Sequence, residues 1–234
     1  MNQGGKGLAE SLSELAIMLA RGPSIADALR SLAEQIAALV GVDSASASLQ
    51  EAGRWRLYAG TDDRSRELER SQKSSMHGPS VEAFRAGTVV ALPDIEQAPP
   101  EWEVFRAAAS ATRTVSVASV PLLSARAQIG AVSLYSASRR YWSRADLDAA
   151  RVLGDLVTSY VVTDVKLATQ QGLIRQLREA LISRVVIEQA KGVLAAERGV
   201  PVSEAFELLR GYARNRGVTV RAVAAAVVDA GFRP

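Results

Sequence analysis

Apolar residues near the start of the chain recur at spacings of three and four, which is the period of an amphipathic helix. One such run covers residues 8–19 and a second covers residues 25–39. Ser24 directly precedes the second run and suits an N-cap, whereas Gly41 follows it and suits a helix end. The pattern therefore predicts two consecutive helices.

The spacing then changes to the alternation that is typical of strands. Residues 44–60 predict a hairpin that turns at Ala52 and Gly53, and residues 114–136 predict a second hairpin around a polar turn. Residues 88–95 predict a further short strand. Because the strands come mainly in hairpins, we expect an antiparallel sheet.

At least one helix is expected between the strands. Pro79 suits the first turn of a helix that Gly87 ends. The preceding Asp62-Asp63 pair is interpreted as two solvated charges in a loop. Helices that precede and interrupt an antiparallel sheet indicate an α+β fold.

From Ser143, the spacing of apolar residues predicts one long helix, with Ser143 as its N-cap and Asp146 in its first turn. Apolar residues recur along it every seven positions, at Leu153, Tyr160, Leu167, Ile174 and Leu181. The companion positions include the polar Thr163 and Gln170, so the heptad pattern is imperfect. It favours a parallel coiled-coil homodimer, and the alternative is a single helix packed along a domain.

Two further helices are predicted in the tail, with N-caps at Ser203 and Thr219. Together with the end of the long helix they would form a three-helix bundle. The last turns of that long helix carry an apolar stripe that we expect to be buried in the bundle, formed by Ile182, Val186, Ala190, Val193 and Leu194. The expected domains are residues 1–165 with the sheet, a coiled-coil linker at 166–180 and the bundle at 181–234.

The composition excludes several classes of site. The 234 residues include one histidine and no cysteine, which excludes disulfides and thiolate metal sites. His77 does not lie in a metal, haem or triad motif, and no phosphate-binding glycine pattern is present, so we expect no enzyme activity, metal or cofactor. No signal peptide or membrane-spanning run is recognisable, and a cytoplasmic location is expected.

Positive charge is concentrated in the tail. Residues 172–234 contain ten Lys/Arg against six Asp/Glu, whereas residues 1–171 contain 18 against 19. This asymmetry is typical of a nucleic-acid partner, although an ordinary basic helical tail would have it too. Cations able to hold phosphates include Arg184, Lys191, Arg210 and Arg214.

Gly192 stands directly after Lys191, although glycine in a helix interior costs about 1 kcal/mol relative to alanine. Either a neighbouring helix packs closely against it, or a ligand must approach the backbone there. A bare backbone beside cations suits the splayed bases of single-stranded RNA loops. Tyr212 is a candidate for stacking on such a base, but its position in the helical pattern favours burial in the bundle.

The tail resembles the ANTAR domain, an RNA-binding transcription antitermination module. The resemblance rests on "SRVVIEQAKGVLAAERGVPVSEAFELLRGYAR" and on "VAAAVVDAG" after it. It implies that the RNA-binding or motif positions are Arg184, Ala190, Lys191, Gly192, Arg210 and Arg214. It also implies paired hairpins in a nascent leader transcript as the partner.

The first part of the chain resembles a GAF domain, a signal-sensing module, through "GPSVEAFRAGTVVALPDI" and "TVSVASVPLLSARAQIGAVSLYS". The two resemblances imply a regulator in which a sensor of an unknown ligand controls an RNA-binding antiterminator. The alternative is a small-molecule sensor whose tail is a protein-interaction or dimerisation module.

Overall fold

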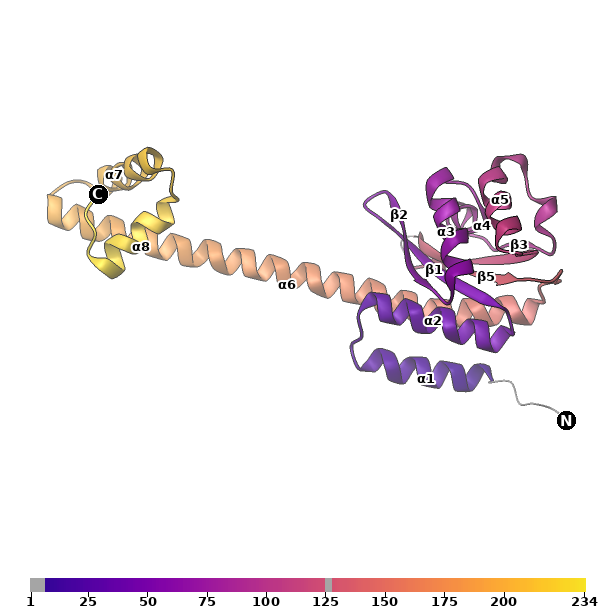
Figure 1. Ribbon diagram of the computed structural model, residues 1–234. Coiled ribbons are helices and arrows are strands. Elements are labelled where there is room, and N and C mark those ends of the chain that lie inside the picture. The colour runs from indigo at the N-terminus through magenta and orange to yellow at the C-terminus, as the bar shows by residue number, and fades with distance from the viewer. Residues whose placement is uncertain (1–6, 125–127) are drawn as a thin grey trace. The chain divides into compact units, whose positions relative to one another are not determined.

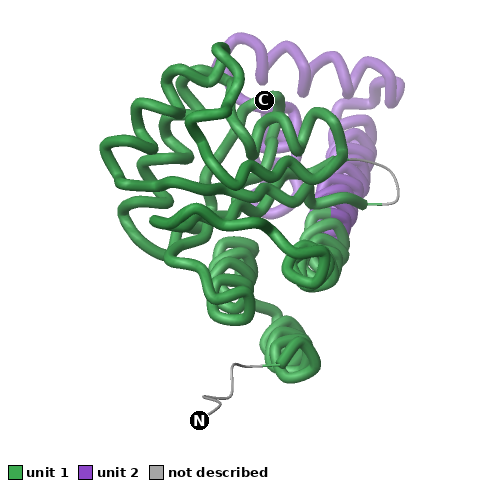
Figure 2. The backbone as a smooth tube through the Cα atoms, turned by 90° about the vertical axis from the view of Figure 1, so that its right-hand side faces the viewer, with its two compact units in different colours: residues 1–165 green, residues 166–234 purple. Residues whose placement is uncertain are grey.

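The computed structural model describes residues 7–124 and 128–234. Part of the N-terminal segment and most of the polar turn predicted in the second hairpin therefore lie outside the described residues. Contacts within the chain divide it into two units, residues 1–165 and 166–234 (Figure 2), and each is described by itself.

The first unit begins with two helices, α1 (Leu8–Ala20) and α2 (Ile25–Val40), as the spacing predicts. The Ser24 hydroxyl accepts a hydrogen bond from the amide of Asp27 at 3.2 Å, which satisfies a free donor at the start of α2. Gly41 ends α2 with a left-handed φ of 68°.

Five strands form an antiparallel sheet in the order β2-β1-β5-β4-β3. The strands are β1 (Ser44–Glu51), β2 (Arg54–Gly60), β3 (Val90–Leu92), β4 (Ser116–Leu123) and β5 (Gln128–Ser136). Both predicted hairpins are confirmed, as β1–β2 and β4–β5, and the first turns at Ala52 and Gly53, both with positive φ. The α+β fold class is likewise confirmed.

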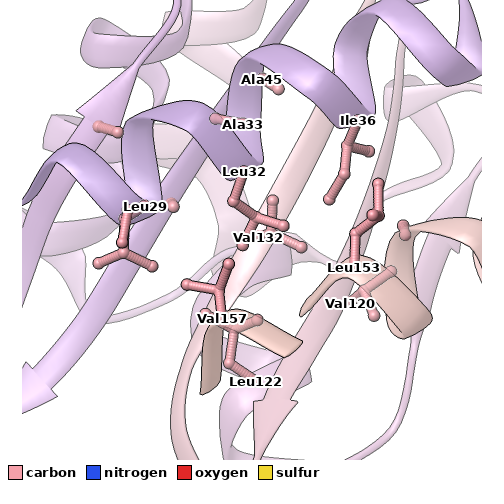
Figure 3. Close-up of a cluster of buried hydrophobic side chains, with 14 of the residues drawn as sticks. Leu29, Leu32, Ala33, Ile36, Ala45, Val120, Leu122, Val132, Leu153 and Val157 are labelled. Atoms are coloured by element: carbon pink, nitrogen blue, oxygen red, sulfur yellow. The ribbon is translucent and has the colours of Figure 1, made fainter. Parts of the chain in front are cut away.

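Helices cover both faces of this sheet (Figure 1). The face towards α2 and the start of the long helix α6 (Arg144–Arg198) is apolar, and Figure 3 shows Leu32 and Ile36 of α2 meeting strand residues and Leu153. The other face is more polar, because buried serines of β1, β4 and β5 alternate with these apolar residues. Each central strand is consequently buried on both sides.

Two helices on the polar face escaped prediction, α3 (Asp63–Ser75) and α5 (Glu103–Ala111). The interpretation of Asp62 and Asp63 as loop charges was wrong, because the Asp62 carboxylate accepts a hydrogen bond from the amide of Ser65 at 2.9 Å and caps α3. The buried face of α3 consists mostly of polar residues, so apolar spacing gives no sign of it. The predicted helix α4 (Pro79–Ala86) is confirmed, and Gly87 ends it.

The long helix α6 begins as predicted. The Ser143 hydroxyl accepts from the Asp146 amide at 3.1 Å, and the Asp146 carboxylate accepts from the Ser143 amide at 3.3 Å. Leu153, Val157 and Val161 are buried in the core of the first unit. Leu153 therefore belongs to that core, so the heptad residues available to another copy begin further along the helix.

In the second unit, the end of α6 packs with α7 (Val202–Arg216) and α8 (Val220–Ala230) around one apolar cluster. Thr219 caps α8 as predicted, but the residue before α7 is Pro201, so the expected cap at Ser203 is wrong. Ile182 of the expected stripe is exposed, whereas Ala190 and Leu194 are fully buried. The stripe enters the bundle only from Val186 onwards.

Candidate nucleic-acid interface

Lys191 is held in place by its neighbours near the end of α6. Its ammonium group donates to both carboxylate oxygens of Glu188, one turn earlier, at 2.9 Å each. It also lies 5.7 Å from the centre of the Phe206 ring on α7, within the range of a cation–π interaction. Only 17% of the Lys191 side chain is exposed. The cation is therefore fixed at the contact between α6 and α7.

Phe206 lies between Lys191 and the predicted cations of α7. Arg210 and Arg214 follow it on α7 at spacings of four, so the three side chains lie along one side of the helix. Arg210 forms an ion pair with Glu207 at 3.5 Å, but both side chains are mostly exposed. Such surface ion pairs contribute little to the free energy of folding. Arg214 is exposed and has no ion pair among the described residues. Both guanidinium groups are available to an anion.

Arg184 lies on the Lys191 side of α6. It is exposed, and it precedes Glu188 by four residues and Lys191 by seven, which places the three on a common helical face. No ion pair of Arg184 is found in the part of the chain that the structure describes. It extends the positive surface by about two turns of α6.

Gly192 borders Lys191 on open surface. A β-carbon built on it would meet no described atom within 4 Å other than those of its two chain neighbours and of the local α6 backbone. Close packing of a helix in the same chain therefore does not explain why this position has no side chain. We refer to Arg184, Lys191, Gly192, Arg210 and Arg214, with Phe206, as the α6–α7 surface.

Ala190 does not belong to this surface. It is fully buried in the apolar cluster of the second unit, beside Leu194 and residues of α7 and α8. A residue without accessible atoms cannot contact RNA, so its prediction as a contact residue has to be corrected. The small side chain instead contributes to the packing of the bundle.

The aromatic residue beside the cations is Phe206, which the sequence reasoning did not select. Tyr212, for which the sequence favours burial in the bundle over stacking, packs against Phe232 at 5.1 Å between ring centres, with Arg216 over the ring at 5.7 Å. The signal that was missed is positional. Phe206 precedes Arg210 by one helical turn, so any surface that includes Arg210 and Arg214 has Phe206 as its next neighbour.

The first unit contains a separate polar site, around the buried carboxylate of Glu69 on α3. Its oxygens accept hydrogen bonds from the hydroxyls of Ser46 at 2.8 Å, Ser48 at 2.9 Å and Tyr135 at 2.9 Å. Trp55 Nε1 donates at 3.3 Å. The pKa of Tyr135 is raised well above its usual value, because burial disfavours the phenolate and the Glu69 charge repels it. The protein's own side chains thus fill this site.

Among the described residues there is no group of three or more His, Asp or Glu side chains placed to hold a metal ion. His77 lies between α3 and α4, with its Nδ1 3.9 Å from a carboxylate oxygen of Glu82. Within the described ranges, no helix has the length and apolar character needed to cross a membrane.

Comparison with known proteins identifies both units. The family model of the GAF domain matches residues 24–161, and that of the ANTAR domain matches residues 175–228. No curated protein matches the chain.

Solved structures of GAF domains share the fold of the first unit. The domain from a Coxiella burnetii phosphoenolpyruvate-protein phosphotransferase is 10% identical, with a TM-score of 0.57 over 71% of this chain and 99% of that one. The corresponding Acinetobacter domain is 16% identical, with a TM-score of 0.55 over 69% of this chain and 97% of that one. The chain belongs to the GAF family and carries an ANTAR domain after its GAF domain, the combination of a sensor-regulated, antiterminator-type regulator.

Proposed function

We propose that the protein is a transcription antitermination regulator that binds paired RNA hairpins of a nascent leader transcript through its ANTAR domain. The observation that carries this proposal is the open backbone at Gly192 beside the fixed cation of Lys191, within the residues that the ANTAR model matches. The binding residues are those of the α6–α7 surface.

The chemistry of this surface suits RNA loops. Lys and Arg side chains neutralise phosphates, whereas a partly exposed aromatic ring such as Phe206 gives a base a face or edge to contact. At Gly192 a base or sugar can come close to the helix backbone without meeting a side chain. Hairpin loops present unstacked bases, which this combination of groups can recognise.

The apolar residues of α6 beyond the first unit support a homodimer. Leu167, Ile174 and Leu181 are 51%, 49% and 65% exposed, and they keep the seven-residue spacing. Exposed apolar residues in a continuous row are unusual on a monomer and typical of a partner surface. We infer that a second copy covers them as a parallel coiled coil, which brings together two RNA-binding domains for two hairpins.

We further propose that the GAF domain controls RNA binding through α6, that the protein acts in the cytoplasm and that it catalyses no reaction. Thr163 and Gln170 place polar groups in the heptad pattern, so the coiled coil is only moderately favoured over other packings. A ligand of the GAF domain can then shift the balance between two arrangements of the helix.

One observation favours the alternative, a tail that binds a protein. The second unit has an apolar groove of about 250 Å³, lined by residues that include Tyr212, Val218 and Phe232. A protein partner seated there would bury apolar side chains, and its affinity would depend only weakly on salt.

The test is the RNA that the full-length protein binds in its host. RNA cross-linked to the protein is sequenced, and a hairpin pair from it is titrated with protein at several salt concentrations. Four cations per copy predict a slope of log affinity against log salt of about −3, at −0.7 for each single-strand contact. Absence of enriched hairpins, or a slope near zero, would favour the protein-binding alternative.

A further inference from the structure

A cavity of about 760 Å³ lies in the first unit beside α5, and it is separate from the Glu69 site. Its walls come from the short helix η1 (Ile95–Gln97), from α5, and from the residues around the start of β4 and the end of β5. Pockets for small molecules in proteins typically have volumes of about 300–1,000 Å³. The cavity is therefore large enough for a small organic ligand.

Arg106 of α5 contributes an unsatisfied cation to this cavity. Its Nε is buried and has no hydrogen-bond partner, and the side chain makes no ion pair among the described residues. A guanidinium group without an ion pair is suited to binding a carboxylate or phosphate through two parallel hydrogen bonds. Arg113, two residues after the end of α5, also makes no ion pair in the described chain and lines the same cavity.

The acidic residues of the cavity do not cancel these cations. Asp94 is already occupied, since it accepts hydrogen bonds from the Arg139 guanidinium and from the amide of Glu96. The hydrogen bond from Arg139 is the main reason why the pKa of Asp94 is lowered. Glu96 and Glu103 are exposed to solvent at the cavity. An anion inside can reach Arg106 while these carboxylates stay hydrated.

The rest of the wall includes the hydroxyl side chains of Ser110 and Thr114 and five apolar residues, Ile95, Ala107, Ala109, Val115 and Ala137. We propose that this cavity binds a small organic anion, whose carboxylate or phosphate pairs with Arg106 and Arg113 and whose apolar part lies against these residues. This proposal gives the chemical class of the ligand that the GAF domain senses, and it rests on the proposed function of that domain as a sensor.

The position of the cavity gives such a ligand access to the start of α6. Ala137 is part of the wall and belongs to the segment that joins β5 to α6. Its amide donates a hydrogen bond to the carboxylate of Asp43 at 2.8 Å. Arg140 of the same segment donates to the carbonyl of Val40 at 2.7 Å and to the Asp146 carboxylate at 3.1 Å. The cavity thus adjoins the residues that tie the end of α2 to the first turn of α6.

The test is isothermal titration of the full-length protein with benzoate, with phenyl phosphate and with inorganic phosphate, at concentrations up to about 10 mM. We expect at least one of these anions to bind. Preference for benzoate indicates a carboxylate ligand, and preference for phenyl phosphate indicates a phosphate ester. Inorganic phosphate alone would contradict the role of the apolar wall.

Variants locate the site. Arg106→Gln and, separately, Arg113→Gln should each weaken binding about tenfold or more. The control Arg54→Gln, which removes an exposed cation from β2, should bind as the unchanged protein does. No binding of any of the three anions, or equal binding by all variants with folding checked by circular dichroism, would overturn the proposal. Because ligand binding is measured without RNA, this failure is distinct from failure of the proposed RNA binding.

Discussion

Two stretches of α6 have similar apolar content but opposite surroundings. Leu153, Val157 and Val161 are buried against the sheet and α2 of the GAF domain. Leu167, Ile174 and Leu181 continue the seven-residue repeat to which Leu153 belongs, but they are about half exposed or more. The same repeat therefore serves packing within one domain first and a surface for a partner afterwards. Only contacts between elements far apart in the sequence decide where one use ends and the other begins.

The exposed stretch is the place where the largest effect is expected. Ile174→Glu combined with Leu181→Glu would place charges in the proposed seam, and each buried Leu or Ile contributes about 1.5–3 kcal/mol. We expect the dimer dissociation constant to rise by at least about 100-fold, measured by sedimentation equilibrium. Gln176→Glu, which lies outside the heptad positions, is the control and should leave the dimer intact. A monomeric unchanged protein at micromolar concentration would exclude the dimer altogether.

A substitution in the buried stretch should affect the stability of the GAF domain. Leu153→Ala removes a fully buried side chain from the GAF core and should lower the free energy of unfolding of that domain by about 2–5 kcal/mol. Urea denaturation measures this loss. The neighbouring Val152→Ala, at a more exposed position, should change it by no more than about 0.5 kcal/mol. Equal effects of the two substitutions would contradict the burial of Leu153 in the GAF core.

The sequence predicted those parts of the molecule in which local pattern and tertiary contacts agree. The hairpins, the helices α1, α2 and α8, and the start of α6 follow from alternation, spacing and caps such as Ser24, Ser143 and Thr219. Prediction failed for α3, because its buried face is mostly polar. There Glu69 accepts hydrogen bonds from side chains of the sheet, such as the hydroxyl of Ser48.

The candidate site shows the same division. Cations, Gly192 and the order of the helices are visible in the sequence, but the position of each side chain depends on packing between helices. Burial of Ala190 and contact of Lys191 with Phe206 both arise where α6 meets α7. A helical period alone assigns Ala190 equally well to the core and to a motif on the surface.

A third substitution concerns the end of α6, where the surface is proposed to bind RNA. Lys191→Ala removes the fixed cation, and we expect hairpin affinity to fall by about 1–3 kcal/mol, the loss typical of a charged hydrogen bond. Arg221→Ala removes an exposed cation of α8 and is the matched control. Filter binding or fluorescence anisotropy with the hairpin recovered from the host measures both. An equal loss in the two variants would indicate nonspecific attraction by net charge.

A smaller effect is expected from the partner of Lys191. Both carboxylate oxygens of Glu188 accept hydrogen bonds from the Lys191 ammonium group. The carboxylate is negatively charged, as is an approaching phosphate, so the two repel each other. Glu188→Gln should therefore strengthen hairpin binding, by about 0.5–1 kcal/mol, because the competing ion pair is removed. The control is Glu204→Gln, on an exposed turn of α7. If Glu188→Gln weakens binding, Glu188 orients Lys191 for RNA and does not compete with it.

The central claim is that the α6–α7 surface is left open at Gly192 for RNA, and Gly192→Ala tests it most directly. Beyond its chain neighbours and the local helix backbone, the added β-carbon meets no described atom within 4 Å. The free energy of unfolding of the variant should therefore be higher by about 1 kcal/mol. Gly172→Ala, at an equally open position of the same helix, serves as the control for helix propensity. We expect both variants to be more stable, Gly192→Ala to bind the hairpin more weakly and Gly172→Ala to bind it normally. Unchanged hairpin affinity in Gly192→Ala would contradict it.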